Sequence, residues 1–276
     1  MKTIKLLKRD ITLGIIKRWY ILMIPIIFAV AQSWQCSELI KDLLSTDTIS
    51  SKCTVMDYIL YSMQGMNVFK FDPHQSFAIP IYWFAFQIGV SYYVAYYAYN
   101  DFVDNGRNIY MALKNRTAWW ISKVLWCLIS VFIYYIVTFV TISVISVSLG
   151  AKLTTNVSLD LQTFLFGPDM LCVYMKDIWL ILIILPIFTT IALCLVQLLL
   201  GFVISPVISF AVMCAEYVLS AYYTSWFFIA NYTMWMRSSY VNEEGINPIS
   251  GMILAIMLII VSVWSGIIYF NDKDVF

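Results

Sequence analysis

Long apolar runs separated by polar segments are the main pattern along this chain. A helix needs about 20 mostly apolar residues to cross the hydrocarbon core of a bilayer. Six runs approach or exceed that length, and the third is so long that we expect its first turns to project from the membrane. We therefore expect an all-α polytopic membrane protein with six spans, at 20–33, 78–99, 118–149, 178–200, 207–223 and 251–270.

The pattern before the first span is different. Apolar residues recur at helical spacing, while most of the lysines and arginines fall elsewhere; the apolar set is Ile4, Leu7, Ile11 and Ile15. A helix with separate apolar and basic faces lies in the plane of the lipid headgroups. We predict such an amphipathic interfacial helix over 1–19, with a basic tail that only orients the first span as the alternative.

Lysine and arginine are distributed unevenly between the polar segments. If the N-terminus is cytoplasmic, 11 of the 17 basic residues lie on the cytoplasmic side, with the strongest bias next to the first span. Cytoplasmic loops carry such an excess. We expect both chain ends in the cytoplasm and the segments 34–77, 150–177 and 224–248 on the other side.

Composition agrees with a single transmembrane domain over 1–276. The chain is 62% hydrophobic and 12% charged, whereas soluble domains are about half apolar and a quarter charged. A net charge of +1 argues against nucleic acid as a partner. The six cysteines contain no C-x-x-C pair, so no metal site is predicted. Cys36 and Cys53 share one segment expected outside the cytoplasm, where a disulfide between them is one alternative and two free thiols the other.

One polar segment, 101–123, lies between the second and third spans. It holds much of the charge of the chain, has a break at Gly106 and contains a helix-like run over 108–114. Its charged residues are Asp101, Asp104, Arg107, Lys114, Arg116 and Lys123. We predict a cytoplasmic helix that contacts a soluble partner; an ordinary solvated loop is the alternative.

The order of these elements resembles the ABC-2 type permease family, the membrane subunits of bacterial ABC exporters. The local match is Asp104-Asn105-Gly106, then Arg116, then Ser122-Lys123, similar to the acid-x-Gly, Arg and Ser/Ala-Lys run of the family's coupling helix. Family members commonly have Glu where this chain has Asp101 or Asp104. The resemblance in element order covers nearly the whole chain, and the residue match covers about 20 positions.

The resemblance implies a permease in the bacterial cytoplasmic membrane that works as a dimer, with a second identical or different permease subunit. ATP and Mg would be bound by a separate ATPase. This chain has no G-x-x-x-x-G-K-[ST] phosphate loop and is expected to be neither an enzyme nor a cofactor binder. The coupling helix would be 101–117, with ATPase-coupling residues Asp101, Asp104, Gly106, Arg107, Tyr110, Lys114 and Arg116. An amphipathic peptide, a drug or a lipid-like compound is the expected substrate.

Three polar side chains inside expected spans are candidates for a translocation pathway. Glu216 lies midway along the fifth span, where an ionisable group is costly and usually faces a cavity or the bundle interior. Gln87 and Gln197 are weaker candidates. The alternative for all three is a hydrogen bond to a neighbouring helix.

Other classes of protein fit the sequence less well. An intramembrane enzyme needs clustered catalytic groups, and the chain has one His, outside the expected spans, and one acid midway along a span. The binding subunit of a vitamin importer would not need the charged segment. A membrane sensor or immunity partner that transports nothing is a further alternative.

Overall fold

The computed structural model describes residues 2–46, 53–70, 77–103, 116–158, 161 and 178–272. Within these residues the regular structure is helical, with eight α-helices and no β-sheet. The helices are α1 (Lys2–Ile11), α2 (Met23–Ser45), α3 (Val55–Met63), α4 (Ile81–Asp101), α6 (Arg116–Ser148), α9 (Leu185–Val203), α10 (Pro206–Tyr222) and α11 (Pro248–Asp272). The fold class is therefore all-α, as the sequence predicts.

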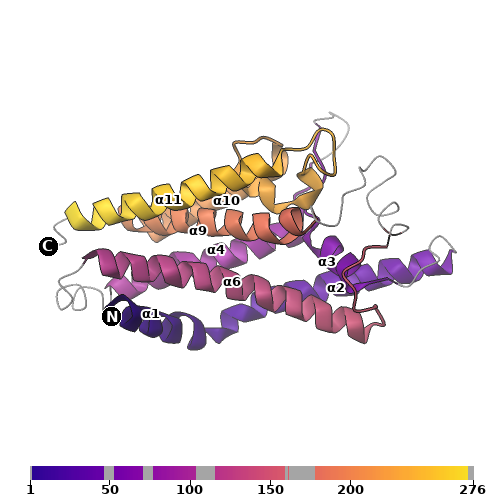
Figure 1. The fold of residues 1–276 in the computed structure, drawn as a ribbon, viewed down its shortest axis with the longest axis horizontal. Coiled ribbons are helices and arrows are strands. Elements are labelled where there is room, and N and C mark those ends of the chain that lie inside the picture. Colours follow the sequence, from indigo (N-terminus) through magenta and orange to yellow (C-terminus); the bar gives the residue numbers. More distant parts are fainter. Residues whose placement is uncertain are drawn as a thin grey trace.

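The long helices form an elongated bundle in which successive helices run in alternating directions (Figure 1). The beginning of α1 and the end of α11 lie at the same end of this bundle, which we call the α1 end. The central helix is α9, which contacts α4, α6, α10 and α11. The short helix α3 packs on α2 and α6 toward the opposite end.

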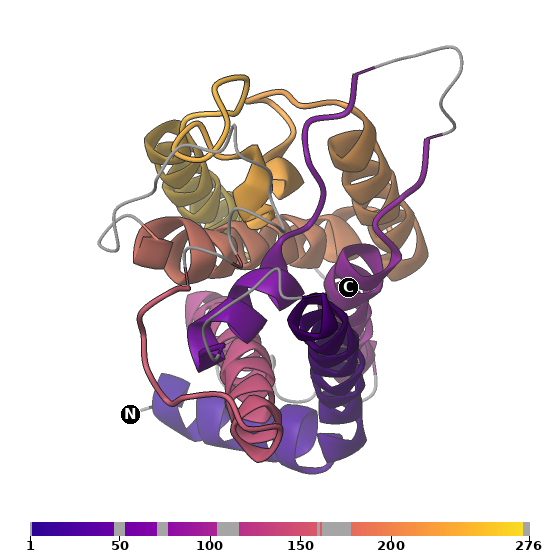
Figure 2. The ribbon, with the colours of Figure 1, turned by 90° about the vertical axis from the view of Figure 1, so that its right-hand side faces the viewer.

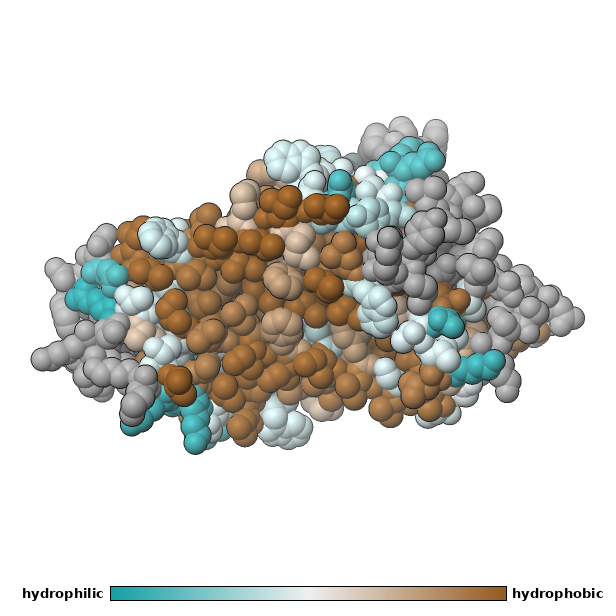
Figure 3. Space-filling view, viewed as in Figure 1, coloured by the Kyte–Doolittle hydropathy of each residue, from teal (hydrophilic) through white to brown (hydrophobic). Residues whose placement is uncertain are grey.

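Four helical stretches are long and apolar enough to cross a membrane: Trp19–Ser45, Arg116–Ser148, Leu180–Val203 and Pro248–Asn271. A brown apolar band covers the middle of the face shown in Figure 3, with polar residues toward its ends. Side chains in the band are exposed because lipid, rather than protein, is their expected neighbour. These features make the chain a multi-pass membrane protein. The helices α4, with its six tyrosines, and α10, with 17 residues, fall outside this set of four, so spans there stay predictions.

The helix α2 extends much further than the expected span 20–33. It continues through part of the predicted external segment to Ser45. Its added turns keep an apolar face, with Ile40 and Leu43 buried, and carry an exposed Lys41–Glu38 pair on the other face. The polar residues that suggested an early end therefore lie on the exposed side of a continuing helix.

The N-terminal helix is shorter than predicted. α1 ends at Ile11 and is followed by a π-helical turn, Thr12–Ile16, and a 3-10 turn, Trp19–Leu22. α1 lies across the end of the bundle, at a clear angle to α2 (Figure 2), and packs on α6. Of the predicted apolar stripe, Ile15 is buried and Leu7 and Ile11 pack against the core, whereas Ile4 is 71% exposed. The buried face also includes Leu6 and Asp10, which the stripe leaves out.

The segment between α10 and α11 is held by a fully buried arginine. Arg237 donates hydrogen bonds to the carbonyl oxygens of Ser220 and Ala221 at the end of α10, and to Asn231 Oδ1. It also donates to the carbonyl oxygens of Met66 and Asn67, at 3.3 and 3.4 Å. Burial lowers the pKa of Arg237 to about 10, so the guanidinium stays charged at neutral pH. The carbonyl end of a helix favours such a cation.

Candidate functional site

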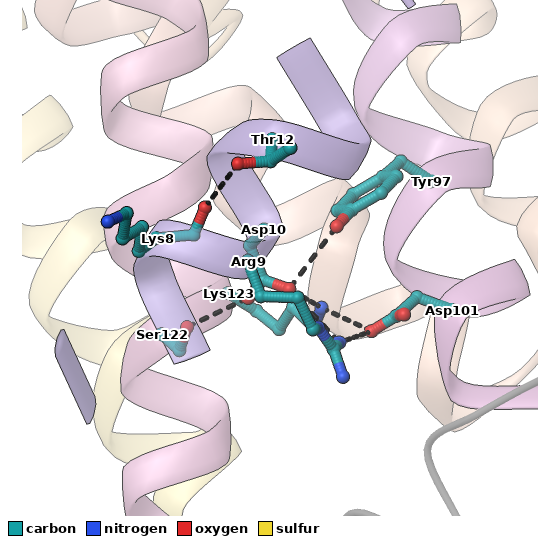
Figure 4. A network of polar contacts seen from close by, with 8 residues as sticks. All are labelled: Lys8, Arg9, Asp10, Thr12, Tyr97, Asp101, Ser122 and Lys123. Carbon is teal, nitrogen blue, oxygen red and sulfur yellow. Dashed lines mark hydrogen bonds and ion pairs between the residues drawn. The ribbon is translucent and has the colours of Figure 1, made fainter. Parts of the chain in front are cut away.

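Four charged side chains meet at the α1 end of the bundle, from three different helices (Figure 4). We call Arg9 and Asp10 of α1, Asp101 of α4 and Lys123 of α6 the charge cluster. Lys123 Nζ lies 2.8 Å from Asp10 Oδ1 and 2.6 Å from Asp101 Oδ2. Arg9 Nη2 forms a further ion pair with Asp101 and lies 3.1 Å from Asp10 Oδ1. Two cations and two anions therefore balance each other.

The charge cluster is almost completely shielded from solvent. The side chains of Lys123, Asp10 and Asp101 are 0%, 1% and 4% exposed, and only Arg9 reaches the surface, at 25%. Two hydroxyls complete the coordination of Asp10: Ser122 Oγ donates to Oδ2 at 2.8 Å, and Tyr97 Oη donates to Oδ1 at 3.2 Å. Buried ion pairs hold together only when their remaining polar atoms are satisfied in this way.

Local sequence explains why these groups converge. Asp10 is one turn after Leu6 and one turn before Gly14, and all three positions are buried on the face of α1 and its π-helical extension that meets α6. Gly14 leaves room for the rings of Trp126 and Tyr97, which a Cβ atom at that position would overlap. Close approach at Gly14 thus brings Asp10 within reach of α6.

The chain just after Asp10 is also tied to α4. Tyr93 Oη donates to the backbone carbonyl of Gly14 at 2.9 Å. This carbonyl lies in the π-helical turn, a type of local irregularity that is frequent at functional sites. α1 is therefore fixed by side chains of both α4 and α6.

A second set of contacts braces the same end of the bundle. Five aromatic rings pack together, one from the residue that follows α4 and the others from α6, α9 and α11. We call them the aromatic cluster: Phe102, Trp119, Trp120, Phe202 and Phe270. The ring centroids of Trp119 and Phe270 are 5.1 Å apart, and those of Phe102 and Trp119 are 5.4 Å apart. The end of α4 and the beginning of α6 thus lie between the charge cluster and the aromatic cluster.

The predicted coupling residues are partly within the described structure. Asp101 is buried in the charge cluster. Arg116 is half-buried, and its Nη1 donates to the carbonyl oxygen of Asn271 at the end of α11, at 2.9 Å. The other coupling residues lie outside the described residues: Asp104, Gly106, Arg107, Tyr110 and Lys114.

The three pathway candidates all have hydrogen-bond partners. Glu216 Oε1 accepts from Ser220 Oγ at 3.2 Å and from the backbone N–H of Ala230 at 3.3 Å. Gln87 Oε1 accepts from Thr190 Oγ1, at 3.4 Å, and Gln197 Oε1 accepts from Ser91 Oγ at 2.6 Å; both bonds join α4 to α9.

These hydrogen bonds agree with the structural alternative for each side chain. Each side chain also has a second polar atom that takes no part in these bonds. The role of Glu216, Gln87 and Gln197 in a pathway stays a prediction.

Cys36 and Cys53 are buried free thiols in the same apolar core. Burial, together with the negative charge of Asp57, raises the pKa of the Cys53 thiol to about 11. A thiol of that pKa is almost entirely protonated at neutral pH and reacts slowly, because the thiolate is the nucleophile. A disulfide between the two stays a prediction.

Sequence reasoning missed Asp10, which has the most polar partners in the charge cluster. One signal was available: Asp10 is the sole acid among the first 20 residues, within a strongly basic stretch. An acid within such a basic stretch, one turn before a glycine, favours a specific buried cation as its partner. Within the described residues, no group of three or more His, Cys, Asp or Glu side chains could hold a metal ion.

No protein-family model, curated protein or solved structure matches this chain.

Proposed function

We propose that this chain is the permease subunit of an ATP-driven exporter of the ABC-2 type. In this proposal it has six spans, lies in the bacterial cytoplasmic membrane with both ends in the cytoplasm, and forms the translocation pathway with a second permease subunit. A separate ATPase binds ATP and Mg. The substrate is an amphipathic peptide, a drug or a lipid-like compound.

The observation that carries the proposal is the position of the charge cluster. Residues 104–115 join α4 to α6, and Asp101 and Lys123 lie on either side of that segment, 2.6 Å apart through Nζ and Oδ2. If a segment transmits a displacement from an ATPase, the helices at its two ends must be held rigidly. Packed side chains and ion-pair networks are the physical means by which displacement passes between sites.

The two clusters give the push a route to the rest of the bundle. Through the charge cluster, the end of α4 and the beginning of α6, which flank 104–115, are tied to α1, which lies in the headgroup plane in this proposal. Through the aromatic cluster, they are tied to α9 and α11. Displacement of one segment would therefore move α1 and the spans together.

The proposal divides the predicted coupling residues into two groups. Asp101 is buried and paired, so it holds the end of the coupling segment and does not touch the ATPase. Contact with the ATPase is assigned to Asp104, Gly106, Arg107, Tyr110, Lys114 and Arg116.

Co-purification tests this proposal. The tagged chain is purified in mild detergent from its own host, and its companions are identified by mass spectrometry. We expect a stoichiometric partner that carries a G-x-x-x-x-G-K-[ST] sequence. The partner should be lost from the triple variant Arg107→Glu, Lys114→Glu, Arg116→Glu.

The matched control reverses three charges at the opposite end, in Lys41→Glu, Lys70→Glu, Lys152→Glu, where all three residues are exposed. This control should retain the partner. A chain that purifies alone under every mild condition would overturn the proposal and favour a sensor or immunity role. Equal loss of the partner in both triple variants would remove the coupling helix as its docking site.

A further inference from the structure

A cavity of about 320 Å³ opens beside the charge cluster, where α1 turns into α2. One wall comes from the junction of the two helices, with Lys17, Arg18 and Tyr20. The other wall comes from the last turns of α4, with Tyr97, Asn100 and Asp101. The cavity therefore joins the α1–α2 junction to the end of α4 that precedes the polar segment.

The cavity carries a net positive charge. Neither Lys17 nor Arg18 forms an ion pair within the part of the chain that the structure describes. The one acid in the wall, Asp101, is already neutralised by Lys123 and Arg9. The Arg18 guanidinium lies 5.4 Å from the centroid of the Tyr97 ring, which orients it by a cation–π contact. Two uncompensated cations beside amide and phenol groups suit a phosphate.

An exposed apolar stripe begins at the same cavity and runs along the next helix. Its members recur every three or four residues and are each between 42% and 62% exposed: Tyr20, Met23, Ile27, Val30 and Trp34. From Met23 to Trp34 the helix rises about 16 Å. One leaflet of the hydrocarbon core is about 15 Å thick. The stripe thus matches the length of an acyl chain that starts at the headgroup level of the cavity.

We propose that this cavity binds the headgroup phosphate of an anionic phospholipid, with an acyl chain of the same lipid along the α2 stripe. Exposed Trp19 and Tyr20 agree with this depth, because amphipathic rings gather at the membrane–water interface. A lipid bound there would lie beside Tyr97 and Asp101, next to the charge cluster. This inference stands independently of the proposed transport function.

Native mass spectrometry of the full-length chain in detergent tests the site. The probes are phosphatidylglycerol, phosphatidylcholine, inorganic phosphate and glycerophosphoglycerol, which has the headgroup without acyl chains. We expect one phosphatidylglycerol molecule to be retained in preference to phosphatidylcholine. Because each basic residue near an anionic surface contributes about a fivefold gain in affinity, Lys17→Gln, Arg18→Gln should weaken phosphatidylglycerol binding about 30-fold.

Two further variants show whether such a loss is specific. Lys17→Arg, Arg18→Lys keeps both charges and should retain the lipid. Lys41→Gln, Lys70→Gln removes two exposed cations at the opposite end and should also retain it. The unfolding temperature of each variant is measured, and lipid binding is compared only between variants that match the wild type in this temperature. If the Gln pair folds poorly, the charge-conserving pair still tests the site.

Several outcomes would overturn the proposal. Equal retention of both lipids by the wild type, or retention by the Gln pair, would remove the phosphate site. Displacement of the lipid by millimolar phosphate or glycerophosphoglycerol would assign the cavity to a free anion. A lipid-free dimer that dissociates on Ile27→Glu would assign the stripe to a second copy of the chain.

Discussion

Lys123 of α6 and Asp101 of α4 form a buried ion pair across the segment that separates them in sequence, with Nζ 2.6 Å from Oδ2. Asp10 of α1 receives the same ammonium group at 2.8 Å. One lysine therefore joins three helices, and Arg9 supplies the second positive charge. These four charged side chains, whose charges sum to zero, connect the N-terminal helix to both sides of the polar segment.

The first prediction concerns the pair Lys123 and Asp101. Lys123→Met leaves two buried carboxylates with only Arg9 as counter-charge, so we expect it to lower the free energy of unfolding by about 3–5 kcal/mol. Asp101→Asn should also destabilise. The double variant should lose clearly less than the sum of the two, because each change removes the partner that the other leaves unpaired. Thermal unfolding in detergent measures all three variants against the wild type.

Additive losses in that cycle would show that the two side chains are not energetically coupled. A second readout separates stability from mechanism. If the polar segment is a coupling helix, the double variant should still co-purify with the ATPase and yet export less. Normal export by a stable double variant would remove the charge cluster from the coupling route.

The second prediction concerns the close approach of α1 to the bundle. In Gly14→Leu, the added side chain has no room against Trp126 and Tyr97, so α1 must move away. We expect faster cleavage by trypsin at Lys5 and Lys8, together with a lower unfolding temperature. Gly201→Ala is the matched control, because the added Cβ would lie 3.5 Å from Ser209 Oγ, an ordinary contact. Unchanged tryptic cleavage in Gly14→Leu would contradict the packing described for α1.

Most helices of the bundle could be located from the sequence, because long apolar runs are a local property. The expected span 251–270 corresponds to α11, Pro248–Asp272, and the expected span 118–149 to α6, Arg116–Ser148. The predicted span 20–33 is shorter than α2, which continues to Ser45, because polar residues on one face of a helix resemble a loop in the sequence. A short helix over 56–63 is predicted by the local pattern and corresponds to α3, Val55–Met63, but its packing against the buried face of α2 is a contact that no local pattern predicts.

The charge cluster is even harder to predict from local sequence. Lys123 belongs to the family-like run and Asp101 to the predicted polar segment, but their partners in α1 are 113 and 92 residues away along the chain. The apolar periodicity predicts a face with Ile4 and Ile11; Ile11 does pack against the core, but Ile4 is exposed and Asp10 is buried instead. An acid can occupy the core-facing position only because a cation from another helix meets it there.

The third prediction concerns Arg237, whose guanidinium donates hydrogen bonds to five backbone and side-chain oxygens. Arg237→Lys keeps the charge but offers three donors from a single nitrogen, so several carbonyl groups lose their partners. We expect this variant to lose at least about 3 kcal/mol of stability, since hydrogen bonds to charged groups contribute about 1.5–3 kcal/mol each. Thermal unfolding gives the measurement. The exposed cation Lys70, changed to Gln, is the control and should alter stability little.

The fourth prediction concerns Glu216, where structure and transport can be separated by two substitutions. Its Oε1 accepts hydrogen bonds from Ser220 Oγ and from the Ala230 backbone N–H at the 3-10 turn Ile229–Thr233. Glutamine can accept the same two bonds, so Glu216→Gln should keep the unfolding temperature of the wild type. Glu216→Ala leaves the Ala230 N–H without this acceptor and should cost about 1–3 kcal/mol.

Export by the stable Gln variant then decides between the two interpretations of Glu216. Loss of export at an unchanged protein level, in Glu216→Gln, would mean that the negative charge itself acts on the substrate, as expected for a pathway residue. Unchanged export would assign the carboxylate to holding α10 against the 3-10 turn. A Gln variant that unfolds as readily as the Ala variant would contradict the hydrogen bonds themselves, because an amide oxygen satisfies both donors.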